Sequence, residues 1–312
     1  MLGKLLLGIV FSFGAPLVLF AQERHYVSYG GTAGFQATVW AMKDLGTFEK
    51  YGLNGDVVLV GGSARLIQGV LGGCTDFAQV DITAVVAANL KGADLVMVGG
   101  TLNRIPFSMV TQPEIREPNQ LRGKKIGVVN FGGANEYAVL AALNEWGIPS
   151  SAATIMPAGG AATRLTAMSA KVLDATVLSP PETIKAEKLG MRILLHLSEL
   201  KTAFPMNVMI VRRPYLEKNR DVVKRMMKAH SDAVYQLKHD KKKAIAVLQK
   251  RLMQKESDVI QGTYDYYTPK FEFPPRVSRD GAAATAKFVL DRVAGGKTSV
   301  DISKLLDESI VD

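Results

Sequence analysis

The sequence predicts a two-lobed α/β fold in which each lobe contains a mainly parallel sheet. Short apolar strands alternate with helical segments, a pattern typical of parallel sheets. One unit is also written twice, as VVLVGGSARLIQGVLGGCTDFAQV over residues 57–80 and as ATIMPAGGAATRLTAMSAKVLDATVL over residues 153–178. Gly62 precedes Asp76 by the same 14 residues that separate Gly160 from Asp174. The chain has 312 residues, which is long enough for two such lobes.

The N-terminus predicts a secretory signal peptide over residues 1–21. Lys4 is followed by an apolar run over residues 5–20 and by Ala21, and polar residues begin at Gln22. The run is shorter than the roughly 20 apolar residues that a membrane-spanning helix needs. We therefore expect cleavage after about Ala21 and a mature chain in the periplasm. The alternative is a retained membrane anchor.

The composition argues against metal, disulfide and nucleic-acid chemistry. Cys74 is the only cysteine, and the four histidines are scattered without metal-ligand spacing. Much of the formal net charge of +9 comes from the C-terminal part, for example from residues 241–243. We interpret these cations as a solvated helix face, since no nucleic-acid-binding module is recognisable. We therefore expect no cofactor, no metal and no nucleic-acid partner. We also expect the protein to be a monomer.

The two halves predict the same order of elements. In the first half we expect strands over residues 25–29, 57–60, 77–80 and 95–98, and helices over about 35–49, from Ser63 onward and over 84–90. In the second half we expect strands over residues 125–129, 154–156 and 175–178, a helix over 136–146 and another after Gly160. From Pro214 onward the pattern is mostly helical, and His230 lies on an apolar stripe, which predicts a packed core histidine.

The repeat predicts a ligand cleft between the lobes. Ligands of open α/β sheets bind beyond the carboxyl ends of the strands, and here those ends are glycine-rich loops. Each loop begins a helix, so that unpaired backbone N–H groups can hold a polar or anionic group. We expect a small polar organic molecule, either neutral or anionic. The candidate binding residues are Tyr29, Thr32, Phe35, Gly62, Ser63, Asp81, Asn130, Phe131, Gly132, Gly133, Gly160, Ser179 and Glu182.

Several of these residues have two interpretations. Ser63 is expected as a helix N-cap that could also donate to a ligand, and Asp81 could accept from a ligand or cap the following helix. Glu182 could contact a ligand amine or simply begin a helix. Arg65 and Arg164 fall in the first turn of matching helices, where the macrodipole disfavours cations. They could serve an anionic ligand or lean into solvent. The rings of Tyr29, Phe35 and Phe131 could stack on a flat or apolar ligand.

Five segments, in this order, resemble a known family. They are AMKDLGTFEKYGLNGDVVLVGGSA, GGCTDFAQ, LRGKKIGVVNFGGANEY, LDATVLSPPE and LGMRIL. The chain resembles the periplasmic substrate-binding proteins of ABC importers in the nitrate, sulfonate, taurine and bicarbonate group, which are related to the thiamine-pyrimidine synthase-like proteins. In two respects the sequence departs from that pattern. Thr75 or Cys74 stands where the family has an acidic residue, and residues 32–35 carry no charged anchor.

The resemblance implies a type II periplasmic binding protein fold, with a mixed, mainly parallel sheet in each lobe and a central ligand cleft. It implies that the chain crosses twice between lobes, near residues 108–111 and 208–211. Lobe I would then comprise residues 22–109 and 209–312, and lobe II residues 110–208. The implied partners are a small-molecule ligand and an ABC permease with its ATPase.

Two other classes of protein are weaker alternatives. An enzyme resembling the thiamine-pyrimidine synthases would need a cysteine- and histidine-rich iron site, which four scattered histidines and one cysteine do not supply. No Walker-type loop or Ser–His–Asp set is recognisable either. The sensor domain of a regulator would share the two-lobed architecture but would carry a helix-turn-helix or further domains. We therefore expect a binding protein and not an enzyme.

Overall fold

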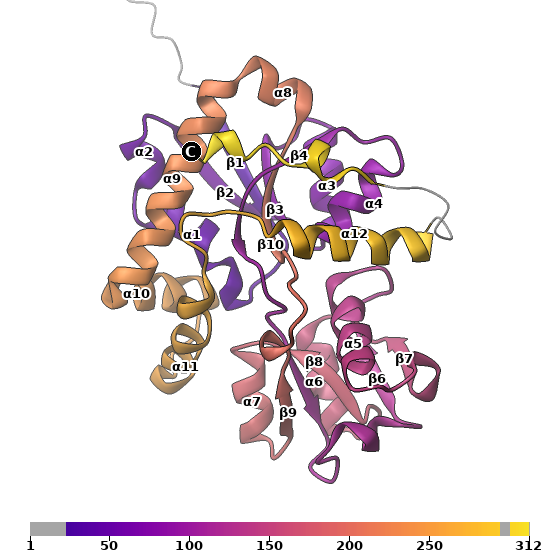
Figure 1. Cartoon of the computed structure of the whole chain (residues 1–312). Coiled ribbons are helices and arrows are strands. Elements are labelled where there is room, and N and C mark those ends of the chain that lie inside the picture. Colours follow the sequence, from indigo (N-terminus) through magenta and orange to yellow (C-terminus); the bar gives the residue numbers. More distant parts are fainter. Residues whose placement is uncertain (1–22, 294–299, 312) are drawn as a thin grey trace, which may run out of the picture.

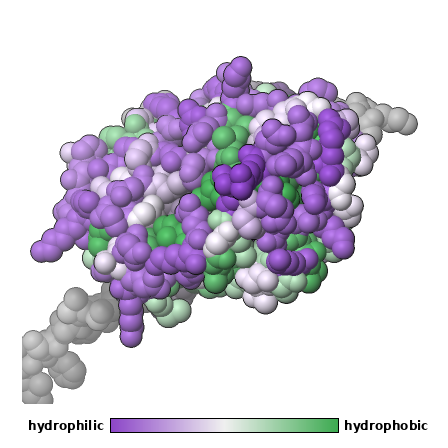
Figure 2. All heavy atoms as spheres, turned by 90° about the horizontal axis from the view of Figure 1, so that it is seen from below, coloured by the Kyte–Doolittle hydropathy of each residue, from purple (hydrophilic) through white to green (hydrophobic). Residues whose placement is uncertain are grey.

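The computed structural model describes residues 23–293 and 300–311 of the chain. The predicted signal peptide over residues 1–21 lies outside this range. Within the described residues no helix is both long enough and apolar enough to span a bilayer. Seen from below, the molecule presents a largely hydrophilic face on which hydrophobic side chains form separate small areas (Figure 2).

The first sheet has five strands in the order β2-β1-β3-β10-β4. Their bounds are β1 Arg24–Tyr29, β2 Asn54–Leu59, β3 Phe77–Val80, β4 Leu95–Leu102 and β10 Asn207–Arg212. Strand β1 runs parallel to β2 and β3, and β10 runs antiparallel to both β3 and β4. Four of the five strands therefore point in one direction, so the sheet is mixed and mainly parallel.

The second sheet repeats this topology in the order β7-β6-β8-β5-β9. Its strands are β5 Ser108–Thr111, β6 Lys125–Val128, β7 Thr154–Pro157, β8 Ala175–Leu178 and β9 Arg192–His196. Strand β6 is parallel to β7 and β8, and β5 is antiparallel to β8 and β9. The single reversed strand stands fourth in both sheets, which confirms the duplicated fold that the repeated sequence unit predicts.

Helices pack against both sheets (Figure 1). The first sheet carries α1 Ala37–Asp44, α2 Thr47–Lys50, α3 Ser63–Leu71 and α4 Ile82–Asn89, and the second carries α5 Ala134–Glu145, α6 Ala161–Ser169 and α7 Glu182–Lys188. The C-terminal helices are α8 Arg213–Lys218, α9 Arg220–His239, α10 Lys241–Leu252, α11 Ser257–Tyr267, α12 Arg279–Val293 and α13 Ile302–Leu305. These six helices belong to the upper lobe of Figure 1, together with the first sheet.

The long helix expected over residues 35–49 is wrong in one respect. The structure divides it into a 3-10 turn over Gly34–Gln36, then α1 and α2, with Gly46 between the two helices at φ +70°. A left-handed residue cannot continue an α-helix, and glycine adopts this conformation without steric cost.

The chain passes between the sheets twice. It leaves the first sheet after Leu102 and enters the second at Ser108, and it returns between His196 and Asn207. The two segments near which the crossings were expected are thus the reversed strands β5 and β10, and each connection lies just before its strand. Both connections run side by side between the lobes in Figure 1.

The hydrophobic core continues through this junction. One large cluster contains side chains of the first sheet, such as Phe77 and Met209, as well as Ile126 of the second sheet. Phe204, in the returning connection, stacks on Tyr137 of α5 with ring centroids 4.6 Å apart. His230 of α9 is 1% exposed, which confirms its prediction as a core histidine, and its burial lowers its pKa to about 4.

Candidate functional site

Loops that follow strands in the two lobes contact each other directly. The backbone N–H of Gly34, beyond β1, donates to the carbonyl of Pro180, beyond β8, at 3.4 Å. The hydroxyl of Tyr267, at the end of α11, donates to the same carbonyl at 3.4 Å. The carboxyl ends of the two sheets therefore face each other at this contact, as the predicted inter-lobe site requires.

Two of the three candidate aromatic residues are part of the core. Tyr29 is 7% exposed and packs edge-to-face on Trp40 at 6.0 Å between centroids. Phe35 is 8% exposed and packs against Phe107 and Tyr267. Phe131, in contrast, is 52% exposed on its loop. Phe131 is therefore the ring that is free to stack on a ligand.

Ser63 and Asp81 join the starts of two helices in the first lobe. The Ser63 hydroxyl donates to Asp81 Oδ2 at 2.7 Å, and Asp81 Oδ1 accepts from the Ala84 N–H at 3.4 Å and from the Thr83 hydroxyl. Asp81 thus caps α4, which is the second of its two expected roles. The expectation that Ser63 caps α3 is wrong, because Gly62 at φ +85° occupies the N-cap position and Ser63 is the first helical residue.

The loop over residues 130–133 has exposed side chains and a backbone N–H that is already hydrogen-bonded. Asn130 and Phe131 are exposed. Gly132 has φ +77°, and its N–H donates to Glu136 Oε2 at 2.6 Å. The Glu136 side chain is 2% exposed and also accepts from Arg292 of α12. The sequence interpretation did not single out Glu136, although an acid in the first turn after a glycine loop is a signal that could have identified it.

Arg164 occupies the interior of the second lobe. It is 3% exposed, and its guanidinium donates to the Gly159 carbonyl at 2.6 Å and to the Val177 carbonyl at 3.0 Å. Burial lowers its pKa to about 10, against the attraction of Glu182. The interpretation that both arginines lean into solvent is therefore wrong for Arg164, whereas Arg65 is exposed.

Ser179 and Glu182 lie in the loop and first helical turn that follow β8. Ser179 is 6% exposed, and its carbonyl accepts from the Glu182 N–H at 2.9 Å. Burial raises the pKa of the Glu182 carboxyl, and the nearby cations Lys185 and Arg164 oppose that rise. Thr32, on the facing lobe, is exposed.

Three helices begin in the repeated loops with glycine as N-cap. The N-cap glycines are Gly62 before α3, Gly133 before α5 and Gly160 before α6. In these three helices no N-cap side chain accepts a hydrogen bond from the first turn. Each first turn offers backbone N–H groups and a partial positive charge. Helix α4 differs, because the side chain of its N-cap Asp81 accepts a hydrogen bond from the first turn. Loops of both lobes therefore offer polar donors, and the loop over residues 130–133 also carries the exposed ring of Phe131.

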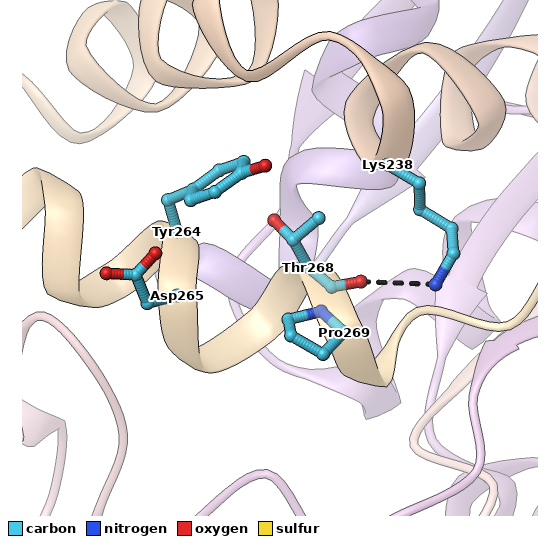
Figure 3. Close-up of a pocket in the computed structure, with 5 residues that line it drawn as sticks. All are labelled: Lys238, Tyr264, Asp265, Thr268 and Pro269. Atoms are coloured by element: carbon cyan, nitrogen blue, oxygen red, sulfur yellow. Dashed lines mark hydrogen bonds between the residues drawn. The ribbon is translucent and has the colours of Figure 1, made fainter.

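A separate hollow of about 280 Å³ lies on the first lobe, between α9 and the end of α11 (Figure 3). Its lining residues are Lys238, Tyr264, Asp265, Thr268 and Pro269. The Lys238 amine is directed to the backbone, donating to the carbonyls of Thr268 at 3.3 Å and Phe271 at 2.7 Å. This amine therefore fastens α9 to the chain after α11, and the hollow includes none of the candidate loops.

The described residues contain no group of three or more histidine, cysteine or acidic side chains that could hold a metal ion. Cys74 is exposed on the turn after α3. Ser108 and His196 pair across β5 and β9 at 2.8 Å, with Ser108 fully buried in the sheet. The Ser108 hydroxyl therefore links two strands and is buried from solvent.

Two sheets of matching topology, joined by two crossing connections, define the fold of the periplasmic binding proteins. The chain belongs to the family described as NMT1/THI5 like, whose model matches residues 36–244. This match confirms the family resemblance predicted from the five sequence segments. No curated protein sequence is significantly similar to the chain.

Solved structures share the fold at low sequence identity. The periplasmic aliphatic sulphonate binding protein SsuA from Escherichia coli is 19% identical, with a TM-score of 0.77 over 93% of this chain and 99% of that chain. The alkanesulfonate-binding protein SsuA from Xanthomonas axonopodis pv. citri, bound to MOPS, is 16% identical, with a TM-score of 0.73 over 92% and 99%. The desulfurization enzyme DSZB is 13% identical, with a TM-score of 0.63 over 92% and 98%. The fold thus occurs in binding proteins and in an enzyme.

Proposed function

We propose that the chain is the solute-binding component of an ABC importer. It captures a small polar organic molecule between its two lobes and delivers it to a membrane permease with its ATPase. The observation that carries this proposal is the set of three glycine N-caps at Gly62, Gly133 and Gly160, which come from both lobes and have no side-chain cap. Such helix starts are suited to a sulfonate, carboxylate or similar polar group.

The lobe division supports capture by closure. In the described part of the chain, two connections, over residues 103–107 and 197–206, join the sheets. Rotation about these connections would bring the loops of lobe I and lobe II together around a ligand. We propose the lobe boundaries near residues 110 and 208, with the C-terminal helices assigned to lobe I. The closed form would be the form that the permease recognises.

Two structural neighbours are sulfonate-binding proteins by name, which makes sulfonates the first class to test. The exposed ring of Phe131 favours a ligand that also has a flat or apolar part. The test is a thermal-shift screen of ligand-stripped protein against MOPS and other alkanesulfonates, nitrate, bicarbonate, pyrimidines and aromatic acids. A ligand present at 100 times its Kd should stabilise the fold by about 2.7 kcal/mol. A protein that shifts with none of these compounds contradicts the proposal.

Location and oligomeric state are part of the same proposal. We propose a periplasmic monomer, released by cleavage of the predicted signal peptide. Fractionation of the producing cells and mass spectrometry of the mature N-terminus test the location, and light scattering tests the monomer. A full-length chain in the cytoplasm would contradict export and would favour a sensor domain.

We assign no enzymatic activity to the chain. Because the desulfurization enzyme DSZB shares the fold, this assignment needs its own test. Compounds that shift the melting temperature are incubated with the protein and then analysed by mass spectrometry. The proposal predicts that each compound is recovered unchanged, and a converted product would identify an enzyme.

A further inference from the structure

Among the residues that the structure describes, ion pairs connect the lobes at two places, which differ in burial. On one side, Lys188 of α7 pairs with Glu256 at 2.5 Å and with Asp258 at 2.9 Å, next to and within the start of α11. All three of these side chains are exposed. On the other side, Arg292 of α12 pairs with Glu136 of α5, whose side chain is 2% exposed. Unlike the first set, this second pair holds a buried charge between the lobes.

Glu136 also connects this ion pair to the loop over residues 130–133. One carboxylate oxygen accepts from Arg292, and the other accepts from the Gly132 N–H at 2.6 Å. Gly132 has φ +77°, so the loop has a specific backbone geometry at the residue that Glu136 holds. One carboxylate therefore bridges a helix of lobe I and the glycine loop of lobe II.

Neighbouring side chains keep these two helices in contact. The ring of Tyr137, next to Glu136, packs edge-to-face on Phe288 of α12 with centroids 4.8 Å apart. In Figure 1, α12 runs along the edge of the upper lobe that faces α5 of the lower lobe. A rotation of the lobes that separates these helices would leave the Glu136 carboxylate without its cation. A buried carboxylate that loses its partner is costly, so it must move or become solvated.

We infer that Glu136 and Arg292 are positioning residues that couple the shape of the loop over residues 130–133 to the relative orientation of the lobes. Removing the Arg292 cation from lobe I should loosen the loop in lobe II, because Glu136 then reorients and releases the Gly132 N–H. This inference deepens the proposed function, since it concerns a loop of the proposed ligand site. Its test requires no ligand, so its failure would be distinguishable from a failure of solute binding.

The experiment is amide hydrogen exchange of ligand-free protein, measured at Gly132 by NMR or on the peptide that contains residues 130–136. Arg292→Met should accelerate exchange at Gly132 by about fivefold or more, given a pair that is buried on one side and part-exposed on the other. Arg292→Lys, which can still pair with Glu136, should restore most of the protection. Glu136→Gln should keep the Gly132 hydrogen bond through its amide oxygen but lose the charge, giving an intermediate rate.

Arg279→Met is the matched control. Arg279 lies on the same helix as Arg292 and pairs with Glu308 inside lobe I, away from the loop. Exchange at Gly132 in the Arg279→Met variant should equal that of the wild type. Circular dichroism should show that all variants are folded. Unchanged exchange in Arg292→Met would overturn the inference. Equal acceleration in Arg292→Met and Arg279→Met would also overturn it, since the effect would then be a general loosening of α12.

Discussion

Arg65 and Arg164 lie in the matching helices α3 and α6, three residues after Gly62 and four residues after Gly160, and they have opposite surroundings. Arg65 is exposed, whereas Arg164 is 3% exposed and holds the carbonyls of Gly159 and Val177. These carbonyls belong to two neighbouring segments at the proposed site of lobe II. We predict that Arg164→Met destabilises the fold and that Arg65→Met does not.

Opposing contributions set the magnitude for Arg164. Burial lowers its pKa from 12.5 to about 10, which corresponds to a cost of roughly 3 kcal/mol for the charged form. Each hydrogen bond from a charged donor contributes about 1.5–3 kcal/mol, so two such bonds offset this cost. Methionine removes both, and the buried Val177 carbonyl loses this partner at a cost of about 1–3 kcal/mol. We expect a net loss of about 2 kcal/mol.

Urea denaturation at neutral pH measures this difference. The midpoint for Arg164→Met should fall while the slope of the transition stays that of the wild type, and Arg65→Met should remain within about 0.5 kcal/mol of the wild type. If Arg164→Met is as stable as Arg65→Met, the hydrogen bonds of Arg164 do not support lobe II, and the reasoning is refuted.

Three further predictions concern stability. Gly132→Ala should cost about 1–2 kcal/mol, because φ is +77°, and Gly160→Ala, at φ −64° with open space around a Cβ, should change unfolding by less than about 0.5 kcal/mol. Equal costs would refute the strain argument. Asp81→Ala should lower the melting temperature through a lost cap of about 1–2 kcal/mol, and an unchanged melting curve would contradict the capping role. Burial lowers the pKa of His230 to about 4 in the fold, so below pH 6.5 the unfolded chain binds a proton there that the folded chain does not. The free energy of unfolding should therefore fall by about 3 kcal/mol in total as pH falls from 6.5 to 4. His230→Leu should remove this part of the pH dependence, which chemical denaturation at each pH would reveal; an identical slope in both proteins would exclude His230 as its source.

The duplicated sheets could be predicted because their signals are local. Apolar strands, glycine turns and the repeated unit around Gly62 and Gly160 all lie within short stretches of sequence. The break at Gly46 is local too, but the apolar spacing on both sides favoured one continuous helix. Strand β10 is different, because it inserts between β3 and β4 from far along the chain. The family resemblance implied a lobe crossing near residues 208–211, but nothing in the sequence predicted a strand there or its place in the sheet.

The candidate site was harder to predict because burial depends on distant contacts. Glu136 receives its cation from a residue 156 positions away. Arg164 lies four residues after Gly160, where the first copy of the repeat has the buried Leu66 after Gly62. A charged side chain therefore occupies a core position that an apolar pattern does not mark. Ser63 has the composition of an N-cap, yet Gly62 takes that position and leaves the hydroxyl for Asp81.

The central claim is that both lobes hold the same molecule. Variants of Gly61, which precedes the α3 N-cap Gly62, and of Gly160, the α6 N-cap, test it most directly. Neither glycine has a positive φ, and a Cβ at either would meet no atom within 4 Å, so a larger side chain should leave the ligand-free fold intact. Calorimetric titration with the compound that gives the largest thermal shift is performed on Gly61→Leu and on Gly160→Leu. The account predicts that each substitution weakens binding at least about tenfold while the ligand-free melting temperature is unchanged. Full affinity in either variant would place the ligand on one lobe alone and would contradict capture between two.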